Sequence, residues 1–251
     1  MRVTALSVTP VKGLRLQRVD RIDLGRKGAV GDRRFIVVDA RDRMINSKVM
    51  GELQTVVAEC VDGHLRLQFP DGRAVEAPVA LGEPIAAQFF SRIVEGRVLD
   101  GPWAGALSEH VGKQVRLVEA EGSVDRGAPG AASLISRASL DRLASEAGVD
   151  AVDARRFRML IEVDGLDAHE EDDWVGRPTR VGESVIRWGG HVGRCLITSR
   201  HPETAGIDLP TLDILGDYRG RLQTTEPLPF GIYGAVERGG AVTVGDEVTP
   251  V

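Results

Sequence analysis

The sequence predicts a mainly β protein with a few helices, in which short strands form a barrel or a sandwich. Short apolar runs alternate with Gly, Asp and Pro turn signals along most of the chain. The 30 glycines, set against 6 Phe, 3 Trp and 2 Tyr, suit many tight turns between strands. A length of 251 residues is enough for two modest domains or one large one, and either can bury a core.

Six apolar runs predict the strands of the first hundred residues. They are residues 3–11, 19–24, 33–40, 56–61, 64–69 and 74–79. The last two runs read as a hairpin, because Leu65, Leu67 and Phe69 alternate on one face and a Pro-Asp-Gly turn follows at residues 70–72.

Two segments predict helices. In residues 103–112 the apolar residues Trp103, Leu107 and Val111 recur every fourth position, and a glycine can end the helix. In residues 136–148, Ser136 is a plausible N-cap, followed by an amphipathic run that ends at another glycine.

The Gly-rich stretch 119–133 predicts a linker or an active-site loop. We place a domain boundary there, with domains at residues 1–120 and 121–251. Beyond it, four runs again predict strands: residues 156–165, 179–190, 194–200 and 239–251.

The composition excludes several classes of function. A net charge of −5 and a pI near 5.6 argue against a nucleic-acid partner, which needs a basic surplus. The start has no apolar signal-peptide core, and no run approaches the roughly 20 apolar residues of a membrane span. Two cysteines make no disulfide framework. We therefore expect a cytoplasmic protein without a membrane partner.

Cys195 is the first candidate for chemistry. It could pack as a small hydrophobe on a strand, as we expect for Cys60. Three features favour a site instead. Arg194 precedes it, and a neighbouring cation favours the thiolate that attacks or ligates. The glycines of "WGGHVG" allow close backbone approach, and "SRHPETAG" (residues 199–206) reads as a loop at the lip of a pocket.

Two alternatives recruit histidines to this thiol. A zinc site of His191, Cys195 and His201 lacks the usual ligand spacing, so the sequence disfavours it. A Cys-His nucleophile with His191 or His110 as the base stays open, although no local pattern supports it.

Three short basic groups could converge on one anion. They are Lys12 in "TPVKG", Arg33 and Arg34 in "GDRRF", and Arg155, Arg156 and Arg158 in "ARRFR". Taken singly, each reads as a solvated surface charge. Arginine nevertheless suits bidentate phosphate recognition, and positions at turns and strand ends would direct these groups into a cleft.

The ordered motifs carry a family resemblance. "TPVKG", "GDRRFIVVD", "LISRASLDRL", "RRFRMLIEVDG", "EDDWVGRPTRVGE", "RCLITSRHPETAG" and "PFGIYGAV" follow one another along the chain. Together they resemble the MOSC family with its N-terminal β-barrel domain, in particular bacterial relatives of the mitochondrial amidoxime reducing component. The resemblance runs nearly end to end and implies two β-barrel-like domains.

The resemblance implies a molybdenum cofactor, in which a pterin dithiolene and Cys195 ligate molybdenum. A soft thiolate is a natural ligand for a metal that sulfur already holds. The positions that correspond to cofactor contacts are Lys12, Arg33, Arg34, Ser136, Arg156, Arg158 and Arg194. An N-cap explains Ser136 equally well.

The resemblance further implies an oxidoreductase that reduces small N-hydroxylated compounds by oxygen-atom transfer to molybdenum. Two cysteines cannot make a four-cysteine cluster, so electrons would come from a separate flavoprotein or ferredoxin. The alternative is a carrier of molybdenum cofactor or sulfur without turnover of its own; a degenerate structural partner is the third reading. "GAPGAASLIS" (residues 127–136) and "FRML" (residues 157–160) depart from the family pattern, which predicts an altered, less polar pocket wall.

Overall fold

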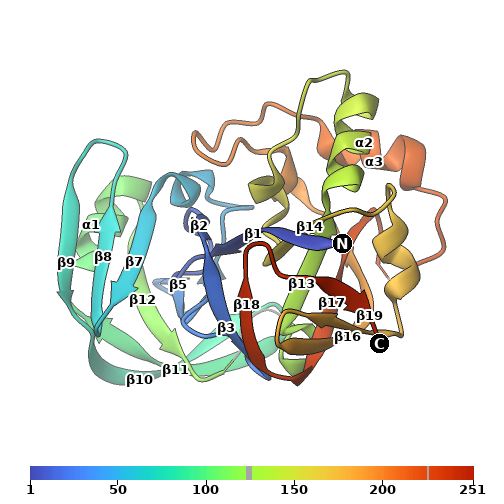
Figure 1. Ribbon diagram of the computed structural model, residues 1–251. Coiled ribbons are helices and arrows are strands. Elements are labelled where there is room, and N and C mark those ends of the chain that lie inside the picture. The colour runs from blue at the N-terminus through green and yellow to red at the C-terminus, as the bar shows by residue number, and fades with distance from the viewer. Residues whose placement is uncertain (123–125, 225) are drawn as a thin grey trace.

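The structure, a computed structural model, describes residues 1–122, 126–224 and 226–251. Its strands form four sheets, of eight, five, three and three strands, and three α-helices pack beside them (Figure 1). The prediction of a mainly β fold with a few helices is confirmed. Over the described ranges, none of the four sheets closes into a continuous hydrogen-bonded ring.

The eight-stranded sheet is the framework of the second half of the chain. Its order is β19 (Val248–Pro250), β15 (Pro178–Val181), β16 (Ser184–Gly193), β17 (Pro229–Arg238), β13 (Ala132–Ser136), β14 (Ile161–Asp164), β1 (Arg2–Val8) and β2 (Gln17–Val19). Neighbouring strands are antiparallel, except that β13 and β14 are parallel.

The three smaller sheets lie mostly in the first half. One contains β10 (Ala80–Phe89), β11 (Arg92–Asp100), β12 (Val115–Ala120), β5 (Phe35–Asp39) and β6 (Met44–Ile45). Another contains β7 (Val57–Val61), β8 (His64–Gln68) and β9 (Ala74–Pro78). The last contains β18 (Gly240–Thr243), β3 (Arg21–Gly25) and β4 (Gly28–Ala29).

The predicted hairpin at residues 64–78 is confirmed as β8 and β9. Leu65, Leu67 and Phe69 are buried while their neighbours face solvent, and Gly72 has the positive φ that its turn requires. The longer β10–β11 hairpin was not predicted. Its register shifts between Leu81 and Pro84, and this irregularity interrupts the alternation of apolar and polar residues that indicates a strand.

Both predicted helices are confirmed. They are α1 (Trp103–Val111), which ends at a left-handed Gly112, and α2 (Arg137–Ala147), which Ser136 caps and Gly148 ends. A third helix, α3 (Thr211–Arg219), was not predicted. Five short 3₁₀ segments complete the fold: η1 (Gly51–Thr55), η2 (Ala128–Gly130), η3 (Ala154–Phe157), η4 (Glu170–Trp174) and η5 (Leu196–Ser199).

The segment around Cys195 corrects one expectation. Residues 194–200 were predicted as a strand, but β16 ends at Gly193 and η5 follows. The backbone amide and the hydroxyl of Thr198 both donate to the carbonyl oxygen of Cys195, each at 3.0 Å. These two bonds close a tight turn, so Cys195 sits at a strand end and not within a strand.

The two halves of the chain are interleaved. Strand β1 pairs with β14, and β3 pairs with β18, so the first 25 residues complete sheets of the second half. Val3 and Leu6 accordingly share a core with Trp188 and Val248. The division at residue 120 stays a prediction, and residues 123–125 of the proposed linker lie outside the described residues. Among the described residues, no helix combines the length and the hydropathy that crossing a bilayer takes.

Candidate functional site

A cavity of about 510 Å³ lies between the two halves and contains Cys195 in its wall. Both halves supply its lining. The first half contributes Lys12, Gly13, Asp32, Arg33, Asn46, Ser47, Lys48, Phe89, Phe90 and Arg92. The second contributes Arg126, Gly130, Ala131, Ala132, Ser133, Phe157, Arg158, Met159, Leu160, Val192, Cys195, Ile197 and Tyr233. These include residues 130–133 of the segment 127–136 and all of the segment 157–160, the two segments that depart from the family pattern.

Cys195 is a free, half-buried cysteine at the end of β16. Its extended backbone (φ −138°, ψ 176°) precedes η5, and Thr198 fixes its carbonyl as described above. A thiol held at a strand end and open to a cavity is accessible to a ligand or a metal, unlike a thiol packed within a sheet. Cys60 lies elsewhere, on β7, where it packs partly against the core of the first half.

Three of the predicted basic residues meet in this cavity: Lys12, Arg33 and Arg158. The Arg33 guanidinium donates to the carbonyl of Arg158 at 2.9 Å, and that of Arg158 donates to the carbonyl of Leu14 at 2.8 Å. Arg33 and Arg158 both adopt left-handed backbone conformations, with φ of +50° and +55°. Non-glycine residues rarely adopt this conformation, and it is concentrated at functional sites.

Each of these three cations makes the charged form of its neighbours less stable. Burial lowers the pKa of Lys12 well below its usual value, and the charges of Arg33 and Arg158 lower it further. Burial likewise lowers the pKa of Arg158 to about 9, with Arg33 contributing. A bound anion would reverse these effects, because it favours the charged form of each group. The cluster therefore suits an anionic ligand.

Among the lining residues that the structure describes, Asp32 is the acidic one, and the basic ones are Lys12, Arg33, Lys48, Arg92, Arg126 and Arg158. One carboxylate oxygen accepts from the Arg33 guanidinium at 2.6 Å, and the other accepts from the backbone amide of Thr9 at 2.8 Å. Asp32 therefore orients Arg33 and offsets part of its charge, and basic side chains outnumber acidic ones among the described lining residues.

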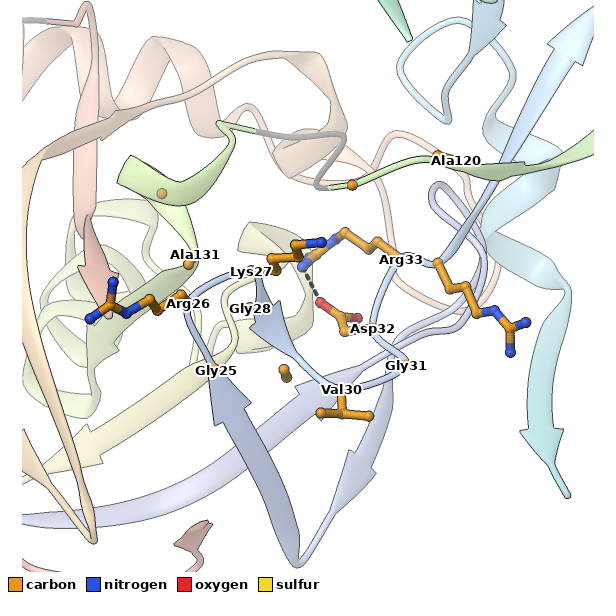
Figure 2. Close-up of a pocket in the computed structure, with 14 residues that line it drawn as sticks. Gly25, Arg26, Lys27, Gly28, Val30, Gly31, Asp32, Arg33, Ala120 and Ala131 are labelled. Atoms are coloured by element: carbon orange, nitrogen blue, oxygen red, sulfur yellow. Dashed lines mark hydrogen bonds and ion pairs between the residues drawn. The ribbon is translucent and has the colours of Figure 1, made fainter. Parts of the chain in front are cut away.

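A second cavity of about 430 Å³ adjoins the first and shares four lining residues with it: Asp32, Arg33, Gly130 and Ala131. Figure 2 shows Lys27 directed towards the Asp32–Arg33 pair, whereas Arg26 points away from it. Arg34 lines this second cavity and not that of Cys195. Its Nε donates to Glu119 at 2.6 Å, so successive arginines face different cavities.

Arg194 does not line the Cys195 cavity. Its guanidinium donates to the carbonyl oxygens of Phe230 (from Nε, 2.8 Å) and Phe157 (2.9 Å), and it contacts the sulfur of Met159 at 3.1 Å. Burial lowers the pKa of Arg194 to about 9. Arg194 thus ties the backbone next to Cys195 to β17 and η3 through hydrogen bonds, without lining the cavity itself.

Arg156 and Ser136 also lie away from the cavity lining. Arg156 is buried and makes a two-point ion pair with Asp208, at 2.7 and 2.8 Å. Ser136 is buried at the start of α2, where its hydroxyl accepts from the amide of Ser139 and donates to the carboxylate of Glu171 at 2.8 Å. The N-cap interpretation of Ser136 is confirmed.

The histidines weighed for a zinc or nucleophile site lie outside the cavity lining. The Nε2 atom of His191 lies 3.6 Å from Asp172, and that of His110 lies 2.9 Å from the hydroxyl of Thr55. His201 accepts from the backbone amide of Glu203 at 3.2 Å. Of residues 196–206, the cavity is lined by Ile197, so "SRHPETAG" does not form its lip.

Sequence reasoning missed Asp32, Tyr233 and the tip of the β10–β11 hairpin as parts of the cavity. The glycines of "WGGHVG" carry a signal for Tyr233. A Cβ atom on Gly190 would lie 2.9 Å from the phenol oxygen of Tyr233, so glycine is needed for the ring to lie against β16. The sequence analysis inferred from these glycines that another group lies close to the backbone. That group is the Tyr233 side chain of the protein itself.

The fold and the cavity define a class of protein: mainly β, with one thiol in a cation-lined cavity between two interleaved halves. The chain belongs to the MOSC family. Residues 121–249 match the MOSC domain, and residues 1–100 match the MOSC N-terminal beta barrel domain.

Named relatives cover nearly the whole chain. It is 27% identical to mitochondrial amidoxime-reducing component 1 of Danio rerio, over 98% of this chain and 83% of that protein. It is 26% identical to mitochondrial amidoxime reducing component 2 of Rattus norvegicus, over 98% and 81%. Among solved structures, the YUAD protein from Bacillus subtilis matches 98% of this chain and 93% of its own, with a TM-score of 0.47 and 12% identity.

Proposed function

We propose that this protein binds molybdenum cofactor in the Cys195 cavity and reduces N-hydroxylated compounds there. The observation that carries the proposal is the cation excess around a single accessible thiol, in a cavity that both MOSC regions build. The names of the relatives support the class of reaction, an amidoxime reduction.

The residues present fit the cofactor. It is an anion with a phosphate arm, and three cationic side chains line the cavity together: Lys12, Arg33 and Arg158. Its metal is soft and sulfur-bound, and Cys195 offers a soft thiolate ligand. A volume of about 510 Å³ suits a ligand of this size.

Each residue has a distinct role in the proposal. Cys195 ligates the metal, while Lys12, Arg33 and Arg158 hold the phosphate with charge-assisted hydrogen bonds. Asp32 positions Arg33 through its 2.6 Å ion pair. Arg194 acts indirectly, because its bonds to two backbone carbonyls fix the chain that carries Cys195.

When bound, the cofactor supplies the two-electron chemistry that breaks the N–O bond. The overall reaction consumes two electrons and two protons, converts N–OH to N–H and releases water. The electrons come from a separate flavoprotein or ferredoxin in this proposal. The cavity orients the N-hydroxyl group towards Cys195 and keeps the reacting bond between the walls of the two halves.

Turnover with a chemical reductant tests the proposal directly. We expect cofactor-loaded protein with reduced methyl viologen to convert benzamidoxime to benzamidine. Cys195→Ala should lose at least about 100-fold of that rate, because loss of an outer-shell partner of a metal ligand already costs about 10- to 100-fold and loss of the ligand itself should cost no less. Cys60→Ala is the matched control and should keep the wild-type rate, since Cys60 lies on β7 away from the cavity.

Loaded protein that turns over no amidoxime or hydroxylamine would contradict the proposal. If such protein instead delivers its cofactor stoichiometrically to an acceptor apoenzyme, the carrier function replaces the reductase function.

A further inference from the structure

The tip of the β10–β11 hairpin places an exposed aromatic ring at the cavity that holds Cys195. Phe89 ends β10, Phe90 begins the turn, and both line the cavity. Their ring centroids are 4.7 Å apart, with an angle of 47° between the ring planes. The hairpin belongs to the first half of the chain, whereas Cys195 belongs to the second.

The two rings have different surroundings. Phe89 is 9% exposed, and its ring has the Lys12 ammonium at 5.7 Å and the Arg92 guanidinium at 5.3 Å. Phe90 is 75% exposed. Phe89 is thus already packed by the protein, while most of the Phe90 ring is open to a further contact.

Phe90 is held in this position at a conformational cost. Its φ of +52° is left-handed, which costs an L-residue roughly 1–2 kcal/mol. The amide of Gln88 donates to the carbonyl of Asp42 at 2.7 Å, and the side chain of Gln88 donates to the carbonyl of Phe90 at 3.3 Å. These hydrogen bonds hold the turn in place, and with it the position of the Phe90 ring.

We propose that Phe90 is a specificity-determining residue, which selects substrates that carry a planar aromatic group on the N-hydroxylated function. An aromatic substituent can stack on the open part of the Phe90 ring while its reacting nitrogen points inward towards Cys195. A small aliphatic substituent gains nothing from that ring. This inference rests on the proposed function, because it concerns the substrate of the same cavity.

Two amidoximes that share the reacting group test this selection. Benzamidoxime carries a phenyl group, and acetamidoxime carries a methyl group. We expect Phe90→Ala to lower the ratio of their kcat/KM values by about 3- to 10-fold, the scale of one ring–ring contact, chiefly through a higher KM for benzamidoxime. Phe90→Tyr keeps the ring and should keep the ratio.

Ile93→Ala is the matched control. Ile93 lies on β11 of the same hairpin and is 60% exposed, but it does not line the cavity. This variant should stay within about twofold of the wild-type ratio, since it removes exposed apolar surface but no stacking partner. A Phe90→Ala ratio equal to wild type, or an equal loss in Ile93→Ala, overturns the inference and points to a protein partner as the group that covers the ring.

Binding gives a second readout that does not depend on turnover. Benzamide has the shape of the substrate without its N–O bond, and saturation-transfer NMR on the purified, loaded protein reports contact with its phenyl protons. We expect its Kd to rise at least about threefold in Phe90→Ala. An unchanged Kd overturns the inference whether or not the protein turns over amidoximes, whereas absent turnover with ring-dependent binding contradicts the proposed function alone.

Discussion

At the scale of single residues, the site is built from charges that repel one another. Lys12, Arg33 and Arg158 line one cavity, and burial together with the neighbouring charges lowers the pKa of Lys12 and of Arg158. Two of the three also have left-handed backbones. Such an arrangement lowers the stability of the cofactor-free protein, and a bound anion would restore that stability. Strain and repulsion of this kind are typical of binding sites.

This arrangement predicts that Lys12→Met stabilises the cofactor-free protein. Methionine keeps the length of the side chain and removes a charge, so we expect a gain of about 0.5–2 kcal/mol in urea denaturation at pH 7. A pKa that is lower in the folded state than in the unfolded state means that Lys12 opposes folding at neutral pH. That penalty fades as pH rises from the lowered native pKa towards the unfolded value of 10.5, so the difference between the two proteins narrows.

Lys113→Met is the control for this variant, because Lys113 is exposed and lies outside the cavity lining. Its stability should stay within about 0.5 kcal/mol of wild type at pH 7. A Lys12→Met protein that is less stable than wild type at pH 7, or whose advantage grows with pH, contradicts the account of a repelling cluster.

Residue types and motifs identified part of the site, but they could not give side-chain direction. Lys12, Arg33, Arg158 and Cys195 were predicted and do line one cavity. Arg34 is next to Arg33 yet faces the adjoining cavity, and Arg194 turns back to bind carbonyls. These directions follow from a turn at Arg33 and from the end of β16, which composition does not encode.

At the scale of elements, the start of α2 shows a serine with a structural role. Ser136 caps the helix, and the buried carboxylate of Glu171 accepts from its backbone amide at 3.1 Å and from its hydroxyl at 2.8 Å. Burial raises the pKa of Glu171, and the hydrogen bonds oppose this rise. The cap therefore also satisfies a buried acid.

We accordingly expect Ser136→Ala to cost about 2–3 kcal/mol of unfolding free energy, the sum of a lost cap and a lost partner of Glu171. Cofactor content per folded chain should be unchanged. Denaturation with urea and metal analysis of the same samples measure both quantities. Ser145→Ala, at an exposed position on α2, should change stability by less than about 0.5 kcal/mol. Loss of cofactor without loss of stability would instead support the cofactor contact that the family resemblance implies.

Sequence patterns predicted the elements whose ends carry capping residues. They failed where hydrogen bonds or an irregular register determine the structure. Ser136 and the glycines at positions 112 and 148 mark the helix ends that the structure has. Residues 194–200 look like a strand, but two hydrogen bonds from Thr198 turn them into η5. The β10–β11 hairpin was missed because its register is irregular near Leu81.

At the scale of the whole molecule, the cavity exists because the two halves interleave. Strands β1 and β3 pair with β14 and β18, which fixes the first half against the second. Lys12 and Arg33 then meet Arg158 and Cys195 across the cavity. No local pattern in the sequence encodes this contact between segments more than 100 residues apart. The residue types indicated only that the basic groups could converge on one anion, and the family resemblance added Cys195 to the same site.

The metal and pterin content of purified protein tests the central claim, that Cys195 and this cavity hold molybdenum cofactor. Protein from a cofactor-producing host should contain about one molybdenum per chain in the wild type and in Cys60→Ala, and far less in Cys195→Ala, because the thiolate is the protein's ligand to the metal. Wild-type protein without molybdenum, from a host whose other molybdoenzymes are loaded, or a Cys195→Ala protein that retains the wild-type amount, would contradict it.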